Sequence, residues 1–209
     1  QKTLSEFRQG SIDILLGTQM VAKGLDFPRV SLVGIINADG MLSLPDYRAG
    51  ERTFQLLVQA AGRSGRSNIP GEVIIQTFQP DHAVINMAIR QDYLGFFTEE
   101  IRLRKSLDYP PFSRLLRIEI SSPKESQARH TADVLRQLIE ERIDSIEDDI
   151  HILGPAPCPV WKLRNRYRFQ IVLKTSHRGL LQSLGNYLLQ YRWDPGVRVV
   201  LDMDPGIMM

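Results

Sequence analysis

Short apolar runs bounded by turn-forming residues indicate strands in the N-terminal part of the chain. Residues 12–16, 30–36 and 72–78 are such runs and are typical of buried parallel strands. Before the last run, apolar residues recur every three or four positions and predict a helix over 51–61. The short stretch 38–40 is predicted as a turn and 41–50 as an irregular loop. Strands that alternate with helices predict a parallel α/β layer.

The pattern becomes helical over 81–106 and then changes to short alternating runs. Asp92 is predicted to cap the second part of the helical stretch. Later helices are expected to start near Ser122 and at Ser176. Strands are predicted at 115–120, 150–153, 168–174 and 197–202. The resulting β-α-β-β-α-β order is that of a ferredoxin-like α+β domain.

Composition excludes some classes of protein. The net charge of +2 and a pI near 8.8 do not by themselves identify a partner. The single cysteine, Cys158, excludes an internal disulfide and a multi-cysteine zinc site, and the histidines lack metal-ligand spacing. We therefore predict no metal site. No apolar stretch of about 18 residues and no signal peptide is present, so we predict a cytoplasmic location without membrane contact.

Two arginines, Arg63 and Arg66, follow the predicted helix 51–61, and each is preceded by glycine. A planar guanidinium suits phosphate, and the helix would give both side chains a firm base. Paired cations of this kind stabilise the charge that spreads over a transferring γ-phosphoryl group. The alternative is a surface helix end whose arginines only complement the helix dipole.

A second candidate region follows the predicted strand 12–16. Ligands of open α/β sheets bind beyond the carboxyl ends of strands, where Thr18, Gln19 and Lys23 would lie. Their hydroxyl, amide and amine groups suit contacts with sugar and phosphate. Asp26 would accept a hydrogen bond from a ribose hydroxyl or pair with an arginine. Taken alone, the region is equally well explained as an ordinary strand–turn–helix.

Together the two regions resemble superfamily 2 helicases. Gly-Thr-Gln-Met-Val-Ala-Lys-Gly-Leu-Asp-Phe at 17–27 resembles their motif V, and Gln-Ala-Ala-Gly-Arg-Ser-Gly-Arg at 59–66 resembles their motif VI. Several further stretches resemble one branch more closely, the primosomal replication-restart helicases. These stretches are 38–40, 45–49, 51–57, 109–112, 153–157 and 201–205.

This resemblance implies the C-terminal portion of such a helicase. Its domains would be the C-terminal part of a RecA-like lobe over 1–80, a helical connector over 81–108 and the ferredoxin-like domain over 109–209. ATP and Mg²⁺ would be bound mainly by an upstream lobe, and zinc only upstream. The chain itself has no phosphate-binding loop, so we expect it to be inactive alone.

The resemblance also assigns roles. Arg63 and Arg66 would contact the γ-phosphate, with Gln59 orienting them or the attacking water. Gly24 and Asp26 would contact the nucleotide and couple it to DNA, while Thr18, Gln19 and Lys23 hold a single strand. The activity implied is 3′-to-5′ unwinding of stalled or branched forks, followed by primosome assembly with other primosome proteins.

The stretch 161–169 combines four cations with aromatic residues and contains no acid. Lys162, Arg164 and Arg168 are predicted to contact single-stranded or forked DNA, because cations follow a phosphate backbone while rings stack on bases. By resemblance, Arg166 and Gln170 would bind the C-terminal tail of single-stranded DNA-binding protein. The alternative is a basic hairpin whose aromatic rings face the core.

Two other functions remain open at this point. One is a different superfamily 2 motor, such as an RNA helicase or a translocase. The other is a non-enzymatic module that docks DNA or protein. A preference for DNA forks over RNA duplexes, and dependence of ATP hydrolysis on Arg66, would separate them from the replication-restart helicase.

Overall fold

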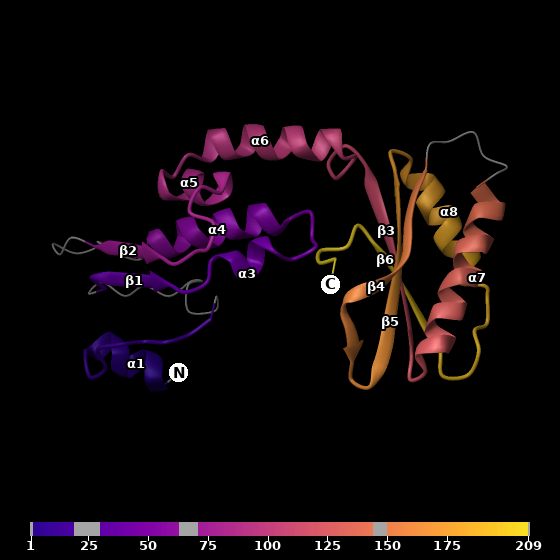
Figure 1. The fold of residues 1–209 in the computed structure, drawn as a ribbon, viewed down its shortest axis with the longest axis horizontal. Coiled ribbons are helices and arrows are strands. Elements are labelled where there is room, and N and C mark those ends of the chain that lie inside the picture. Colours follow the sequence, from indigo (N-terminus) through magenta and orange to yellow (C-terminus); the bar gives the residue numbers. More distant parts are fainter. Residues whose placement is uncertain (1, 19–29, 63–70, 144–149, 209) are drawn as a thin grey trace. The chain divides into compact units, whose positions relative to one another are not determined.

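The computed structural model describes residues 2–18, 30–62, 71–143 and 150–208 (Figure 1). The chain divides into two compact units. The first comprises Gln1–Leu44 and Arg48–Glu100, and the second comprises Pro45–Tyr47 and Ile101–Met209. The boundary between Glu100 and Ile101 lies inside the stretch 81–108, which was predicted to be a helical connector.

The first unit is a small α/β layer. Strands β1 (Leu32–Ile35) and β2 (Glu72–Ile75) pair in parallel, as the apolar runs predicted, with Leu32 opposite Glu72. The helices described in this unit are α1 (Lys2–Gln9), α3 (Asp39–Leu42), α4 (Ala49–Ala61), α5 (Ala83–Ile89) and the first part of α6 (Tyr93–Ser106).

Helix α4 forms the centre of this unit's core because its apolar positions recur at helical spacing. Phe54 stacks on Phe96 of α6, with ring centroids 4.3 Å apart and planes 10° from parallel. Asp92 caps α6 as predicted, since its Oδ1 accepts from Gly95 N at 2.9 Å. The buried core residues are Ala38, Phe54, Leu57, Ile85, Ala88 and Phe96. Helix α5 and the first part of α6 therefore pack against α4 within the first unit.

Two predictions for this unit are wrong. Residues 12–16 do not form a strand: Ile14 and Leu16 are 83% and 85% exposed, and no described strand pairs with them. An apolar run becomes a strand only where another strand satisfies its backbone. The predicted turn at 38–40 and loop from 41 are instead interrupted by α3, which begins at Asp39.

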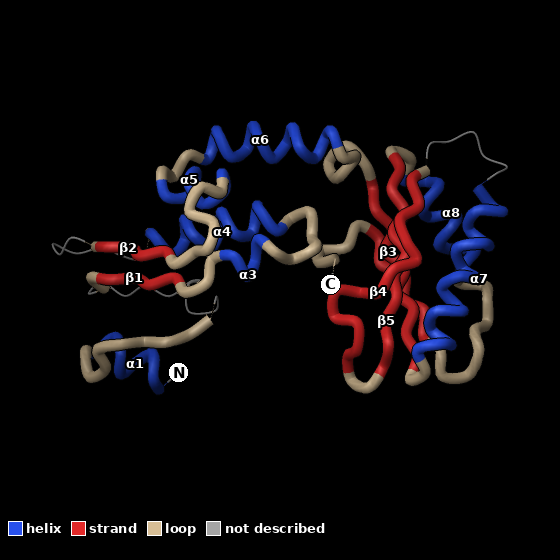
Figure 2. The backbone as a smooth tube through the Cα atoms, viewed as in Figure 1, coloured by secondary structure: helices blue, strands red, loops and turns tan. Residues whose placement is uncertain are grey.

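The second unit is an antiparallel sheet with helices on one face (Figure 2). Its strands are β3 (Arg114–Ser122), β4 (His151–Leu163), β5 (Arg166–Thr175) and β6 (Arg198–Met203), and its helices are α7 (Glu125–Ile143) and α8 (Arg178–Leu188). The spatial order is β4-β5-β3-β6, so β3 lies between β5 and β6. The chain order of these elements is the predicted β-α-β-β-α-β.

Alternation along the strands separates an apolar face from a polar one. In β3, Leu116, Ile118 and Ile120 are fully buried, and Ile118 lies opposite Ile171 of β5 and Leu201 of β6. Both helices cover this face. Their buried contributions are Ala128, Ala132, Leu135, Ile139, Leu181, Leu184 and Leu188. The intervening positions of β3 and β5 point to the other side, which we call the helix-free face.

The start of α8 differs from the prediction by one residue. His177, not Ser176, occupies the N-cap position and its side chain makes no capping bond. Thr175 Oγ1 instead accepts from His177 N at 3.1 Å. This bond holds the residue before the helix and does not cap an N–H of its first turn.

A two-residue turn joins β4 to β5. Arg164 and Asn165 both have positive φ, 49° and 60°, between the paired residues Leu163 and Arg166. Two-residue hairpins favour turns with positive φ at both central positions, because these match the strand twist. Asparagine adopts this conformation readily, whereas a residue such as arginine is strained there by about 1–2 kcal/mol.

Candidate nucleotide, nucleic-acid and partner sites

The end of α4 is a firm base for the predicted phosphate-contacting arginines. Leu57 and Ala60 are buried, whereas Gln59 between them is exposed. The helix ends at Ala61, where Gly62 N donates to Val58 O at 3.0 Å. Arg63 and Arg66, which follow directly, lie outside the described residues. Gln59 is therefore the described member of the predicted catalytic set, and it faces outward.

The predicted DNA and nucleotide contacts near residue 20 are only partly described. Thr18 is exposed in a segment without regular secondary structure. Gln19, Lys23, Gly24 and Asp26 lie outside the described residues.

Asp39 anchors the beginning of α3 to the segment after β2, a role that the sequence reasoning missed. Its carboxylate accepts from Phe78 N at 2.9 Å and from Thr77 Oγ1 at 2.8 Å, and more weakly from Gln79 Nε2 at 3.4 Å. The Phe78 N–H is the main cause that lowers the pKa of Asp39, because these bonds favour the charged form. The anchor fixes the segment that leads towards α4.

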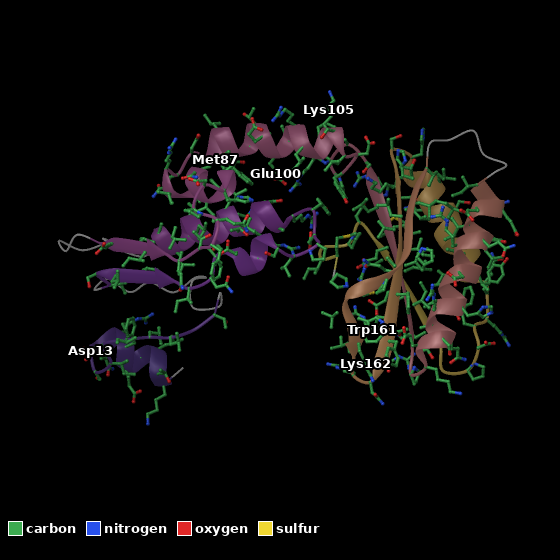
Figure 3. All side chains as sticks on the ribbon, in the orientation of Figure 1. Asp13, Met87, Glu100, Lys105, Trp161 and Lys162 are labelled. Carbon is green, nitrogen blue, oxygen red and sulfur yellow. The ribbon has the colours of Figure 1, made fainter. Side chains whose placement is uncertain are left out.

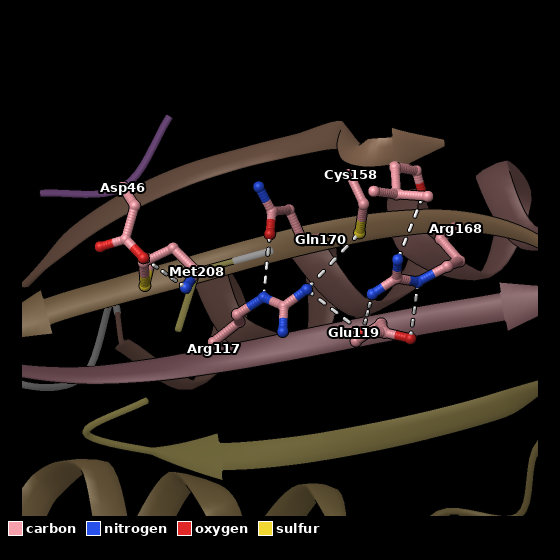
Figure 4. A network of polar contacts seen from close by, with 8 residues as sticks. Asp46, Arg117, Glu119, Cys158, Arg168, Gln170 and Met208 are labelled. Atoms are coloured by element: carbon pink, nitrogen blue, oxygen red, sulfur yellow. Dashed lines mark hydrogen bonds and ion pairs between the residues drawn. The ribbon is translucent and has the colours of Figure 1, made fainter. Parts of the chain in front are cut away.

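A charged network occupies the helix-free face (Figure 4). Arg168 binds the Glu119 carboxylate at two points, Nε to Oε1 at 3.0 Å and NH2 to Oε2 at 2.7 Å. Arg117 NH2 donates to Glu119 Oε2 at 3.2 Å, and Arg117 Nε donates to Gln170 Oε1 at 2.9 Å. The bonds from Arg168, more than those from Arg117, lower the pKa of Glu119, while burial raises the pKa of the nearby Cys158 thiol.

This network changes the interpretation of Arg168. Its side chain is buried, and NH1 donates to Val160 O at 3.1 Å in addition to the two bonds with Glu119. A guanidinium held in this way is unsuited to reach a DNA phosphate. The sequence pattern assigned it to DNA because a run of cations gives no sign of an acid on the neighbouring strand.

Arg166 and Gln170, the predicted partner-binding pair, lie on the same face of β5. Arg166 NH2 donates to Ser121 O and to Gly196 O, each at 2.7 Å, and Nε donates to Ser121 Oγ at 3.2 Å. Gln170 is held by Arg117. Both side chains are therefore fixed in place, half-buried beside the charged network.

The turn end of the β4–β5 hairpin carries the remaining predicted cations. Lys162 and Arg164 are exposed. Lys162 Nζ lies 4.5 Å from the Tyr167 ring centroid and donates to its hydroxyl at 3.2 Å, while Trp161 meets the same ring edge-on at 5.0 Å. Trp161 and Lys162 lie near the turn end of the hairpin (Figure 3). The structure thus brings one of the cations, Lys162, together with aromatic rings.

A column of rings and cations in the second unit was not foreseen. Tyr47 stacks on Tyr109 with centroids 5.0 Å apart and planes 6° from parallel. Arg104 lies 5.2 Å from the Tyr47 ring and Lys174 lies 4.6 Å from the Tyr109 ring. Close by in sequence, Asp46 Oδ2 accepts from Met208 N at 3.2 Å. These contacts explain why Pro45–Tyr47 belongs to the second unit.

The described residues contain neither a metal-binding cluster nor a membrane-spanning helix. Within them, no group of three or more His, Cys, Asp or Glu side chains is placed to hold a metal ion. None of the helices described is both long and apolar enough to cross a bilayer.

Comparison with known proteins identifies the class. Residues 1–68 match the helicase conserved C-terminal domain, and residues 105–206 match the primosomal protein N C-terminal domain. The first unit is thus part of a helicase lobe, joined to a domain found in primosomal proteins.

Similarity to individual proteins makes the family explicit. The chain is 40% identical over its whole length to replication restart protein PriA of Bacillus subtilis, covering 26% of that protein. It is 41% identical over 98% of its length to PriA of Treponema pallidum and 38% over 97% to that of Chlamydia pneumoniae, covering 31% and 27% of them. The chain belongs to the PriA family, and it spans less than a third of these relatives.

Proposed function

We propose that the intact protein is an ATP-driven DNA helicase that acts in replication restart. The observation that carries the proposal is the helicase-domain match over 1–68, which includes all of α4 and the stretch with Gln59, Arg63 and Arg66. The names of the relatives, replication restart proteins, support the process. The proposed activity is 3′-to-5′ unwinding of stalled or branched forks, followed by assembly of other primosome proteins.

In this proposal the end of α4 faces a bound nucleotide. Its buried side fixes the helix, and exposed Gln59 fits a residue that orients a reacting group. Arg63 and Arg66 stabilise the charge of the transferring phosphoryl group, and Gly24 and Asp26 contact the nucleotide. ATP with Mg²⁺ supplies the free energy, and a preceding lobe would provide most of the binding site. Zinc is expected only outside this chain.

Two regions are proposed to hold DNA. Thr18, Gln19 and Lys23 grip a single strand beside the nucleotide, so that closing and opening of the lobes moves the strand. Lys162 and Arg164 hold backbone phosphates at the hairpin turn. Their exposure supports this role. Arg168 is left out because its donors are engaged with Glu119 and Val160.

Arg166 and Gln170 are proposed to bind an acidic tail of single-stranded DNA-binding protein. Support comes from their shared position on β5 and from the cations around them. Arg117 and Arg168 are both buried on this face, with the Glu119 carboxylate between them. Two guanidinium groups against one carboxylate leave a positive excess that suits an acidic, apolar-tipped peptide.

We further propose that the second unit is a ferredoxin-like domain and that the protein acts in the cytoplasm. The domain assignment is supported by the chain order β-α-β-β-α-β and the sheet order β4-β5-β3-β6.

Strand-separation assays test the proposed function. The intact protein with ATP should unwind forked DNA and prefer a 3′ single-stranded tail. A preference for RNA duplexes would favour a different superfamily 2 motor. Tight fork binding without DNA-stimulated ATP hydrolysis would favour a docking module, and either result would overturn the proposal.

A further inference from the structure

The turn end of the β4–β5 hairpin exposes apolar surface. Trp161 is 43% exposed, Leu163 is 48% exposed and Val160 is 43% exposed, although all three belong to a paired strand. Scattered apolar residues on a surface are ordinary. These three, however, are consecutive or nearly so and adjoin the exposed cations Lys162 and Arg164.

The Trp161 ring is held, not loose. It meets Tyr167 edge-on at 5.0 Å, with planes 64° apart, and Lys162 lies against the same tyrosine. An edge contact covers only part of an indole, which agrees with the exposed fraction of Trp161. The ring is therefore pre-positioned and still has surface available, so little conformational entropy is lost when a second flat group stacks on it.

The turn itself carries a residue that the backbone disfavours. Arg164 has a φ of 49°, a conformation that suits glycine or asparagine. The Arg164 side chain is exposed and does not contribute to the core. Backbone strain at such a position indicates that the side chain has a functional role. No acidic residue occurs between Trp161 and Phe169 in the sequence, and the cations nearest the turn, Lys162 and Arg164, are exposed.

We propose that this hairpin tip stacks on unpaired bases at the junction between single-stranded and duplex DNA. Trp161 and Leu163 contact the base faces, and Lys162 with Arg164 hold the neighbouring phosphates. Stacking on an aromatic ring does not depend on sequence, since every base has a π-face, and apolar side chains enter base steps that are easily unstacked. The inference rests on the proposed DNA-binding function and specifies what the tip recognises.

The chemistry favours a base over an acidic peptide as the occupant. The acidic, apolar-tipped peptide is proposed to bind at Arg166 and Gln170, whereas the exposed face of the Trp161 ring suits a second flat group. A base attached to a phosphate uses the ring and the cations at once. Salt separates the two parts of the proposed DNA contact, because phosphate contacts weaken as salt rises whereas stacking changes little.

The test uses the intact protein and forked DNA with 2-aminopurine at the branch nucleotide, whose fluorescence reports stacking. We expect Trp161→Ala to weaken fork binding roughly five- to a hundredfold, the range for one lost base stack, and to abolish the fluorescence change on binding. The loss of fork affinity caused by Trp161→Ala should be the same at about 50 and about 200 mM salt. The loss caused by Lys162→Ala should be smaller at the higher salt concentration. Trp161→Phe should retain most of the signal.

Val134→Ala, which removes an exposed apolar side chain from α7, is the matched control and should bind like the unaltered protein. If Trp161→Ala gives the unaltered fluorescence change and affinity, stacking is wrong and the proposed function stands. Loss of acidic-peptide binding alone, with fork binding intact, also overturns it. If Trp161→Phe loses as much fork affinity and fluorescence change as Trp161→Ala, and the two variants have equal thermal stability, the ring does not stack. Failure of the unaltered protein to bind forks overturns both proposals.

Discussion

Arg168 and Glu119 form a two-point ion pair across neighbouring strands of the sheet, with N–O distances of 3.0 and 2.7 Å. Arg117 shares the same carboxylate at 3.2 Å. Since both arginines are at most 8% exposed, one carboxylate compensates two guanidinium groups that are largely removed from water. This pair determines how the helix-free face responds to mutation and to acid.

Replacing Glu119 should therefore destabilise the second unit. Glu119→Gln leaves Arg168 and Arg117 without their shared anion, and removal of one partner from a buried pair costs about 3 kcal/mol. Denaturant unfolding of this chain measures the change. Glu141→Gln, at an exposed position on α7, should stay within about 0.5 kcal/mol of the unaltered chain.

The same substitution should change the pH profile. The folded-state pKa of Glu119 is lowered, so its contribution is complete above the ordinary glutamate pKa of about 4.3 and is lost as pH falls through the folded value. The unaltered chain should lose stability in that acid range, and Glu119→Gln should lose less. Identical acid profiles for the two proteins would show that the pair contributes nothing.

Arg164→Asn should separate stability from binding. Asparagine tolerates positive φ better than arginine, so the free energy of unfolding should rise by about 1 kcal/mol. Loss of a phosphate contact should weaken fork binding and reduce the slope of log affinity against log salt by about one. Thermal melting and fork titrations at several salt concentrations check the two effects. If the variant is more stable but binds forks with the salt slope of the unaltered protein, Arg164 does not contact DNA.

The Tyr47–Tyr109 stack should contribute measurable coupling. Parallel rings 5.0 Å apart contribute about 0.5–1.5 kcal/mol beyond the area that they bury. A double-mutant cycle with Tyr47→Leu and Tyr109→Leu isolates this energy in denaturant unfolding. Combining Tyr47→Leu with Val134→Ala on α7 provides the additive control. Strict additivity of the two tyrosine substitutions would mean that the contact adds nothing to stability.

Asp39→Asn should loosen the anchor between α3 and the end of β2. The amide keeps the size of the side chain but gives up the negative acceptor of Phe78 N and Thr77 Oγ1. Because the pKa of Asp39 is lowered, its contribution is present above the ordinary aspartate pKa and disappears as pH falls through the folded value. The melting temperature should be lower than that of the unaltered chain at neutral pH, and the difference should narrow in acid. Asp13→Asn, at an exposed position, is the control.

Periodicity predicted those helices and strands whose type follows from the local spacing of apolar residues. The helical spacing through Phe54 and Leu57 predicted α4. Alternation predicted β3, β5 and β6 but only the start of β4, which was expected to end at residue 153 and continues to Leu163. The run at 12–16 misled because apolar composition does not reveal whether a partner strand is present. The role of Asp39 was missed because its hydrogen-bond partners, Thr77 and Phe78, are distant in sequence. Such a contact leaves no pattern in the residues around Asp39.

In the candidate sites too, local patterns were predictable, whereas contacts between residues distant in sequence were not. A run of cations with aromatic rings indicated a basic surface, and Lys162 and Arg164 are exposed, with Lys162 against the Tyr167 ring. The same run could not show that Arg168 turns to Glu119, because the carboxylate lies on a neighbouring strand that is distant in sequence. Arg166 and Gln170 were paired only through resemblance, and their fixed geometry comes from contacts with distant Ser121 and Arg117.

The most direct measurement is DNA-stimulated ATP hydrolysis by the intact protein carrying Arg66→Ala. If Arg66 stabilises the transferring phosphoryl group, kcat should fall by a factor of about 10³ or more while fork affinity stays within about twofold. Arg90→Ala, an exposed arginine at the end of α5, should leave both quantities unchanged. An Arg66→Ala protein that hydrolyses ATP at the unaltered rate would contradict the account.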